Sequence, residues 1–172
     1  MRTIGIAVVL AVLPLAVLSA QRTGCDTSEQ ARFVARESGP PRLWSLLNHS
    51  TLASYEVDVF QLNPFYLSGD FDGDGVQDFA VWLRAPRRAG RSRLAVLRGS
   101  GQAEWLTPDS LLRYPGVGAW YVHPRAEPVG QSAGPEPPPR LRGDAIMVEL
   151  PEASSALIYW NGRRFVSYWQ GD

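Results

Sequence analysis

The sequence contains no lysine, a single cysteine and only two histidines, and each shortage removes a class of chemistry. Without lysine the chain has no Schiff-base nucleophile and no glycine-rich phosphate loop that ends in a lysine. The one cysteine, Cys25, can form no disulfide within the chain. His49 and His123 stand in no recognisable zinc or nucleophile motif. A hydrolase with paired carboxylates stays open, because the order of residues does not show which acids converge in space.

The chain also lacks an excess of either charge. Its 172 residues include 17 basic residues, all of them arginine, and 17 acidic residues. A neutral chain has no electrostatic footprint for nucleic acid, so we expect no nucleic-acid partner. Arginine is concentrated at residues 84–93, around a turn, where we expect a solvated hairpin tip; docking to an acidic surface is the alternative.

One long apolar run is present, without a second. Residues 4–18 follow Arg2 and precede two small residues. This order is typical of a secretory signal peptide, and the run is too short to span a bilayer. We therefore expect a signal peptide at residues 1–20, a single domain without a transmembrane span at residues 21–172, and export to the periplasm, the cell surface or the medium. Whether Cys25 is lipidated stays open, because the residues before it fit a lipoprotein signal poorly.

The most informative stretch, residues 69–78, reads Gly-Asp-Phe-Asp-Gly-Asp-Gly-Val-Gln-Asp. Its acids stand at relative positions 1, 3, 5 and 9, with glycine at position 6, as in loops that wrap a hard cation in oxygen ligands. Each close carboxylate pair costs roughly 4 kcal/mol at an effective dielectric near 20, so the loop should need a cation. Calcium is expected rather than magnesium, because calcium accepts about six to eight oxygens in loose geometry. The predicted ligands are the carboxylates of Asp70, Asp72 and Asp74, the backbone carbonyl of Val76, and Asp78, directly or through a water.

The apolar stretches on either side of this loop are β-prone. Gly73 and Gly75 would supply the positive φ values of a tight turn. Position 12, where an EF-hand carries a glutamate, is Val81, so the unit reads as strand, metal loop, strand. In this it resembles the calcium-binding FG-GAP or VCBS repeat of integrin α-chains and many exported bacterial proteins. The resemblance covers residues 65–83 and implies calcium ligands at the same five loop residues; one copy is too few for a complete propeller.

Around this unit we expect an α+β fold, with short N-terminal helices packed on a mainly antiparallel β-sheet. The first helix should begin at Thr27 or Ser28, run through residue 36 and bury Phe33 and Val34. Further helical segments are predicted at residues 43–47 and, for one turn, at residues 109–113.

Eight segments carry the alternation or the β-prone composition of strands. They are residues 55–60, 79–84, 92–98, 103–106, 119–122, 144–150, 156–160 and 163–169. Asn161-Gly162 predicts a tight hairpin between the last two. Alternation should place Phe165 and Tyr168 on opposite faces of the last strand. Residues 124–140 contain six prolines and almost nothing apolar, which predicts a flexible loop or a polyproline segment.

These observations indicate an exported calcium-binding protein whose metal is mainly structural, with an unidentified protein, glycan or envelope component as its partner. An enzyme is the less favoured hypothesis, because the densest acids are assigned to the metal. Two alternatives stay open. A carbohydrate-binding module would use Trp160, Tyr168 and Trp169, although packing of the sheet accounts for the same aromatics. A calcium-dependent hydrolase would need acids or a histidine converging on a cleft beside Asp78.

Overall fold

A computed structural model describes residues 27–59, 62–86, 92–106, 117–132, 134–150 and 154–171. The described chain begins with two helices, α1 (Thr27–Ser38) and α2 (Pro41–His49). The strands that follow are β1 (Glu56–Val57), β2 (Tyr66–Gly69), β3 (Asp78–Arg84), β4 (Arg93–Leu97), β5 (Ala103–Trp105), β6 (Ala119–His123), β7 (Ala145–Leu150), β8 (Ser154–Trp160) and β9 (Phe165–Gly171). The expected signal peptide, Cys25, the helical turn at 109–113 and the tip of the arginine-rich hairpin lie outside the described residues.

The strands form two antiparallel sheets rather than the one that the sequence predicted. In sheet A the order is β1-β3-β4-β5, and β2 pairs with the same central strand, β3. Sheet B is a meander of β6, β7, β8 and β9. Neither sheet closes into a barrel or a propeller, so the α+β class and the absence of a propeller are confirmed.

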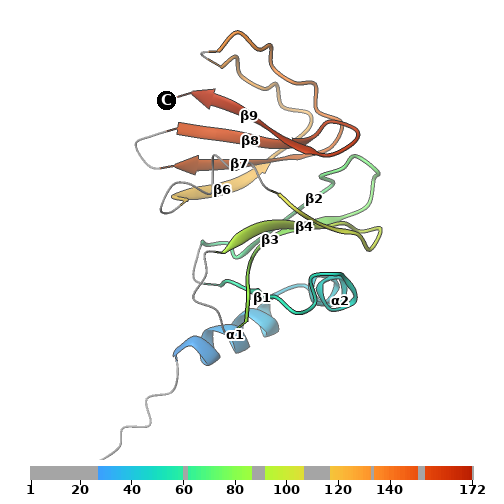
Figure 1. The fold of residues 1–172 in the computed structure, drawn as a ribbon, viewed down its shortest axis with the longest axis vertical. Helices are drawn as coiled ribbons and strands as arrows, with labels where there is room; N and C mark the ends of the chain where they lie inside the picture. Colours follow the sequence, from blue (N-terminus) through green and yellow to red (C-terminus); the bar gives the residue numbers. More distant parts are fainter. Residues whose placement is uncertain are drawn as a thin grey trace, which may run out of the picture.

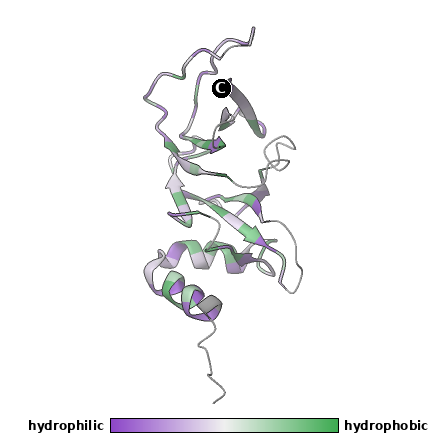
Figure 2. Cartoon of the chain, turned by 90° about the vertical axis from the view of Figure 1, so that its left-hand side faces the viewer, coloured by the Kyte–Doolittle hydropathy of each residue, from purple (hydrophilic) through white to green (hydrophobic). Residues whose placement is uncertain are grey.

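The helices, sheet A and sheet B are stacked in that order as three layers (Figure 1; Figure 2 shows the same order from the side). One core lies between α2 and sheet A and includes Leu43, Leu47 and Phe79. A second core lies between the two sheets, where Trp82 and Trp120 meet edge to face at 6.1 Å between ring centroids. Strand β3 is buried on both faces because it belongs to both cores. Burying each large apolar side chain stabilises the fold by about 1.5–3 kcal/mol.

The first helix is in the predicted place, but its predicted buried side is wrong. Phe33 and Val34 are 64% and 56% exposed, and Ala35 is buried in their place. The α1–α2 corner is tight: the Gly39 N–H donates to Ala35 O (2.8 Å), and a Cβ on Gly39 would lie 2.9 Å from the Trp44 ring. Such close approach favours glycine at position 39. Helix α2 contains the predicted segment and buries Leu43 and Leu47 one turn apart, as i, i+4 spacing requires. Neither helix of the described chain has the length and apolar character of a membrane span.

The predicted strand bounds differ from the structure by one or two residues in most cases, and two strands differ more clearly. The expected strand at residues 55–60 is reduced to the two residues of β1. The last hairpin has a four-residue loop, because β9 begins at Phe165 and not at residue 163. Asn161 closes this loop through its side chain, whose Oδ1 accepts the N–H groups of Arg163 and Arg164 (3.0 and 3.1 Å). The predicted alternation is confirmed, since Phe165 packs against the core between the sheets and Tyr168 is buried on the outer face.

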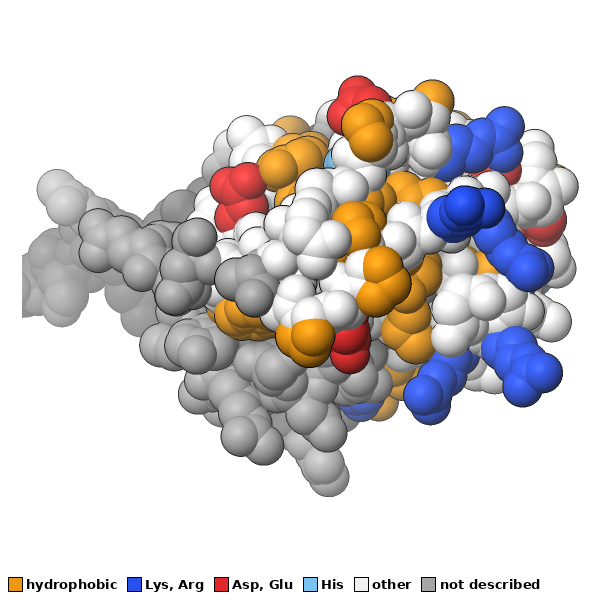
Figure 3. Space-filling view, turned by 90° about the horizontal axis from the view of Figure 1, so that it is seen from above, with side chains coloured by type: hydrophobic (Ala, Val, Ile, Leu, Met, Phe, Trp, Pro, Cys, Tyr) orange, Lys and Arg blue, Asp and Glu red, His pale blue; other side chains and the backbone are white. Residues whose placement is uncertain are grey.

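The proline-rich segment, described here except for residue 133, has no regular structure but is anchored to the outer face of sheet B. The Tyr168 hydroxyl accepts a hydrogen bond from the Ser132 N–H (2.9 Å) and donates one to Glu136 O (3.2 Å). Val129 and Leu141 pack on the same cluster. At this end of the molecule hydrophobic side chains form an interrupted band, and arginines gather to one side (Figure 3).

Candidate metal centre

The aspartate-rich residues form the loop between β2 and β3, as the strand–loop–strand prediction requires. Gly69 and Asp78 are paired across the two strands, so the residues between them must turn back within a short span. Gly73 and Gly75 take φ values of +77° and +85°, a region that residues with a Cβ rarely occupy. The glycine positions in the sequence therefore match the conformation of the loop.

Three of the predicted carboxylates converge and could hold a metal ion. One oxygen each of Asp70, Asp72 and Asp78 lies within 4.8 Å of the other two. That limit is the separation of two oxygens on opposite sides of a cation with bonds of about 2.4 Å. Asp74 is not part of this group, and its Oδ1 accepts the Val76 N–H (2.8 Å).

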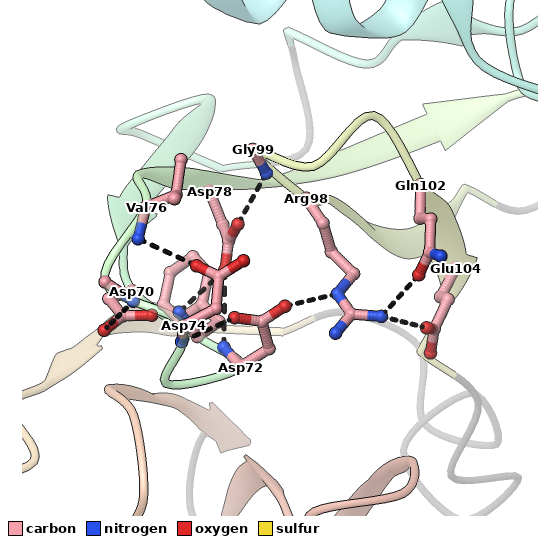
Figure 4. Close-up of polar contacts among 11 residues, drawn as sticks. Asp70, Asp72, Asp74, Val76, Asp78, Arg98, Gly99, Gln102 and Glu104 are labelled. Atoms are coloured by element: carbon pink, nitrogen blue, oxygen red, sulfur yellow. Dashed lines mark hydrogen bonds and ion pairs between the residues drawn. The ribbon is translucent and has the colours of Figure 1, made fainter.

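Asp78 is fully buried and is the best-anchored acid of the loop. Its Oδ2 accepts the N–H groups of Phe71 (2.9 Å) and Asp72 (3.3 Å), and its Oδ1 accepts the Gly99 N–H (2.7 Å; Figure 4). A carboxylate has about four acceptor directions, so roughly one remains for a cation. Asp78 thus joins the loop to the turn between β4 and β5 whether or not it binds metal.

The burial of Asp78 has an electrostatic consequence. Loss of solvent raises the pKa of its carboxyl to about 6, and the nearby Asp72 carboxylate acts in the same direction. The N–H donors of Gly99, Phe71 and Asp72 oppose this rise. A cation between the acids would favour the charged form of each of them.

Two arginines lie against the cluster. Arg98 Nε donates to Asp72 Oδ2, and the pair is well buried, with side chains 15% and 1% exposed. The same guanidinium reaches Glu104 (3.2 Å) and lies over the Trp160 ring, 4.6 Å from its centroid. Arg125 lies 3.5 Å from Asp70 Oδ2 but is itself 58% exposed. Arg98 therefore neutralises part of the buried charge permanently, whereas Arg125 is a weak, solvent-screened partner.

One oxygen has no such partner. Asp70 Oδ1 is shielded from water and accepts no hydrogen bond from the described residues. The other oxygen of that carboxylate accepts the Gly75 N–H (3.1 Å). A buried carboxylate oxygen without a hydrogen-bond donor is costly. A cation in the cluster would coordinate this oxygen at about 2.3–2.6 Å, which is closer than a water molecule approaches. The residues present therefore fit a hard, oxygen-binding cation.

Sequence reasoning missed the contacts that tie this loop to sheet B. Asp144, just before β7, donates its N–H to Asp70 O (2.7 Å) and accepts the Asp70 N–H on Oδ2 (3.1 Å). The adjacent Gly143 is packed so closely that a Cβ there would lie 2.2 Å from Asp70 O. No sequence pattern links residues 74 positions apart. The dipeptide Gly143-Asp144, directly before a strand, was the one local feature that could have indicated this contact.

The remaining chemistry of the described chain lies elsewhere. His49 and His123 contact backbone oxygens of Ser45 and Glu127. Two cavities, of about 720 and 460 Å³, are lined by residues other than the loop acids. Of the aromatics considered for sugar stacking, Tyr168 is buried, Trp160 packs on Phe165, and Trp169 is 40% exposed.

Comparison of the chain with protein-family models, curated proteins and solved structures found no match.

Proposed function

We propose that this protein is an exported calcium-binding domain in which the metal has a structural role. The convergence of the Asp70, Asp72 and Asp78 carboxylates, with Asp70 Oδ1 left without a donor, carries this proposal. The likeness of the loop to an FG-GAP or VCBS repeat and the signal-peptide pattern of residues 1–20 support it from the sequence.

The position of the loop explains why the metal would be structural. Its backbone is bonded to Asp144 of the segment before β7, and Asp78 is bonded to Gly99 of sheet A. A cation held by Asp70, Asp72 and Asp78 would therefore stiffen the point at which sheet A contacts sheet B. Metal bound at a site between two layers stabilises only the native state, because the unfolded chain does not bring these groups together.

The donor set favours calcium over magnesium and transition metals. The gathered ligands are carboxylate oxygens, without cysteine or histidine among them. Hard oxygen ligands select calcium, magnesium or manganese over zinc and copper. Magnesium demands a near-ideal octahedron at about 2.0–2.1 Å, whereas calcium tolerates irregular sites at about 2.3–2.6 Å. The acids of this loop are already oriented by N–H donors and are not free to form an ideal octahedron, so the loop matches calcium better than magnesium.

The test is thermal unfolding of the chain in chelator, in millimolar calcium and in millimolar magnesium. Calcium at 100 times its dissociation constant would stabilise the native state by about 2.7 kcal/mol. For a domain of this size that corresponds to a rise in Tm of about 5–10 °C. Magnesium should give a much smaller rise. An equal Tm in chelator and in calcium would refute the structural-metal proposal.

Matched charge-removing variants locate the site. Asp70→Asn keeps the shape of the side chain and should abolish the calcium-dependent rise in Tm. Glu127→Gln removes a charge from an exposed position outside the cluster and should leave the rise unchanged. Asp74→Asn decides between the sequence prediction, in which Asp74 is a ligand, and a site restricted to the three gathered acids. If Asp70→Asn and Glu127→Gln reduced the calcium-dependent rise in Tm equally, the effect would depend on net charge alone.

A further inference from the structure

A second candidate site lies in the groove between α1, α2 and β1. Its volume of about 720 Å³ falls within the range of roughly 300–1,000 Å³ that is usual for small-molecule pockets. The apolar residues of its wall include Phe33, Ala35, Trp44, Leu47 and Val57. A concave pocket of this size suits a small ligand better than a protein surface, which would need a larger and flatter contact.

Phe33 is the clearest sign that the groove suits an apolar ligand. It lines the groove and yet is 64% exposed, although it is one of the largest apolar side chains of α1. Its neighbour Val34 is also exposed but does not line the groove. Apolar surface in a concavity gains more from a bound apolar group than the same surface on a convex face, because more of it is removed from water.

The charged side chains at the groove are unbalanced. Arg32 and Arg36 both line it from α1, against one acid, Glu56. Glu56 is shared, since its Oε2 lies 3.2 Å from Arg32 and 3.4 Å from Arg84. The groove therefore has an excess of positive charge beside its apolar wall.

Two N–H groups of the groove's own side chains also lack an acceptor. Arg32 Nε and Trp44 Nε1 are shielded from water and have no hydrogen-bond partner among the described residues. An unmet buried donor costs about 1–3 kcal/mol. Because both atoms are closed to a water-sized probe, a ligand oxygen in the groove would bind the exposed outer nitrogens of the Arg32 guanidinium.

We propose that this groove binds a single-chain amphiphile with one carboxylate head, that is, a fatty acid. The alkyl chain would lie along Phe33, Trp44 and Val57, and the carboxylate would lie at Arg32 and Arg36. The apolar wall accounts for the chain, and the unbalanced arginines account for the acidic head. This assignment is independent of the metal centre, which lies on other residues.

The direct test is isothermal titration calorimetry of the chain with dodecanoate below its micelle concentration. Saturable one-site binding is expected. Phe33→Ala should weaken it about tenfold, because that side chain contributes buried apolar area in the complex. Val34→Ala is the matched control and should change the affinity less than twofold. Both positions are exposed on α1, so the two variants should fold equally well.

A filling variant tests the location from the opposite wall. Ala53 is exposed, lies outside the helices and lines the groove. Ala53→Trp should occupy the space and abolish binding. Absence of saturable binding by the unmodified chain would overturn the proposal, and so would unchanged affinity in both Phe33→Ala and Ala53→Trp.

The head group is tested separately. Dodecanol should bind about tenfold more weakly than dodecanoate, and Arg36→Gln should weaken dodecanoate about threefold, as expected for a partly exposed ion pair. Arg163→Gln removes an exposed arginine from the β8–β9 hairpin and is the matched control. Equal affinity for dodecanol would overturn the carboxylate assignment. Much tighter binding of dodecyl phosphate would replace it with a phosphate-headed lipid.

Discussion

The contact between the aspartate loop and sheet B can be tested by adding a single carbon atom at Gly143. A Cβ at this position would lie 2.2 Å from Asp70 O and 2.6 Å from Gly73 N, both backbone atoms. Carbon–oxygen contacts in proteins run at about 3.3–3.6 Å, so the loop and the segment before β7 would have to separate by about 1 Å. Gly143→Ala therefore perturbs this contact without removing any functional group.

The expected cost follows from the contacts that the separation breaks. The hydrogen bonds from Asp144 N–H to Asp70 O (2.7 Å) and from Asp70 N–H to Asp144 Oδ2 (3.1 Å) would be lost or lengthened. Each contributes about 1 kcal/mol, and overpacking adds about 1–3 kcal/mol. We expect Gly143→Ala to lower the free energy of unfolding by about 3–5 kcal/mol.

Urea unfolding followed by tryptophan fluorescence measures this change, in chelator and in calcium. Gly130→Ala is the control, because a Cβ there would meet its nearest neighbour, Gln170, at 3.6 Å. It should change stability by less than about 0.5 kcal/mol. If Gly143→Ala were as stable as Gly130→Ala, the loop would not be clamped to sheet B. If it were destabilised but bound calcium with unchanged affinity, the clamp would not position Asp70.

Two further changes probe the surroundings of the loop and of the outer sheet face. Arg98→Met leaves the Asp72 carboxylate buried without its arginine partner and should lower the free energy of unfolding by about 3 kcal/mol in chelator. The loss should be smaller in calcium, because the cation offsets the charge. An equal loss in both conditions, measured by urea unfolding, would argue against a metal at Asp72. Tyr168→Phe removes the hydroxyl that is hydrogen-bonded to Ser132 and Glu136. The backbone amides of the proline-rich segment should then exchange hydrogen faster, and the free energy of unfolding should fall by about 1 kcal/mol. Unchanged exchange would mean that the apolar contacts alone hold the segment.

Local features of the chain were predicted well because they depend on near neighbours. The glycines at positions 73 and 75 have the positive φ that the loop spacing required. The first helix begins at Thr27, one of the two predicted starting residues, and Asn161 and Gly162 lie in the loop of the last hairpin. These outcomes depend on a few consecutive residues, which sequence reasoning sees directly.

The predictions were wrong where contacts with residues distant in the sequence decide which local arrangement the chain adopts. The run of apolar residues in β3 is longer than alternation allows, and it marks a strand covered on both faces. The prediction of a single sheet left the face of β3 opposite the helices without a cover, which sheet B supplies. On α1, Ala35, whose carbonyl accepts the Gly39 N–H at the corner with α2, is buried, whereas Phe33 is exposed.

The spacing of acids and glycines by itself determined that residues 70–78 form an oxygen-rich loop between two strands, because those residues must share one turn. Only the tertiary structure decided which acids meet. Asp78 is drawn inward by N–H groups of its own loop and of Gly99, Asp72 is paired with Arg98, and Asp74 is left out of the gathered group. Arg98 and Gly99 come from the turn between β4 and β5, and they reach the loop because β4 pairs with β3 in sheet A, which no local pattern records.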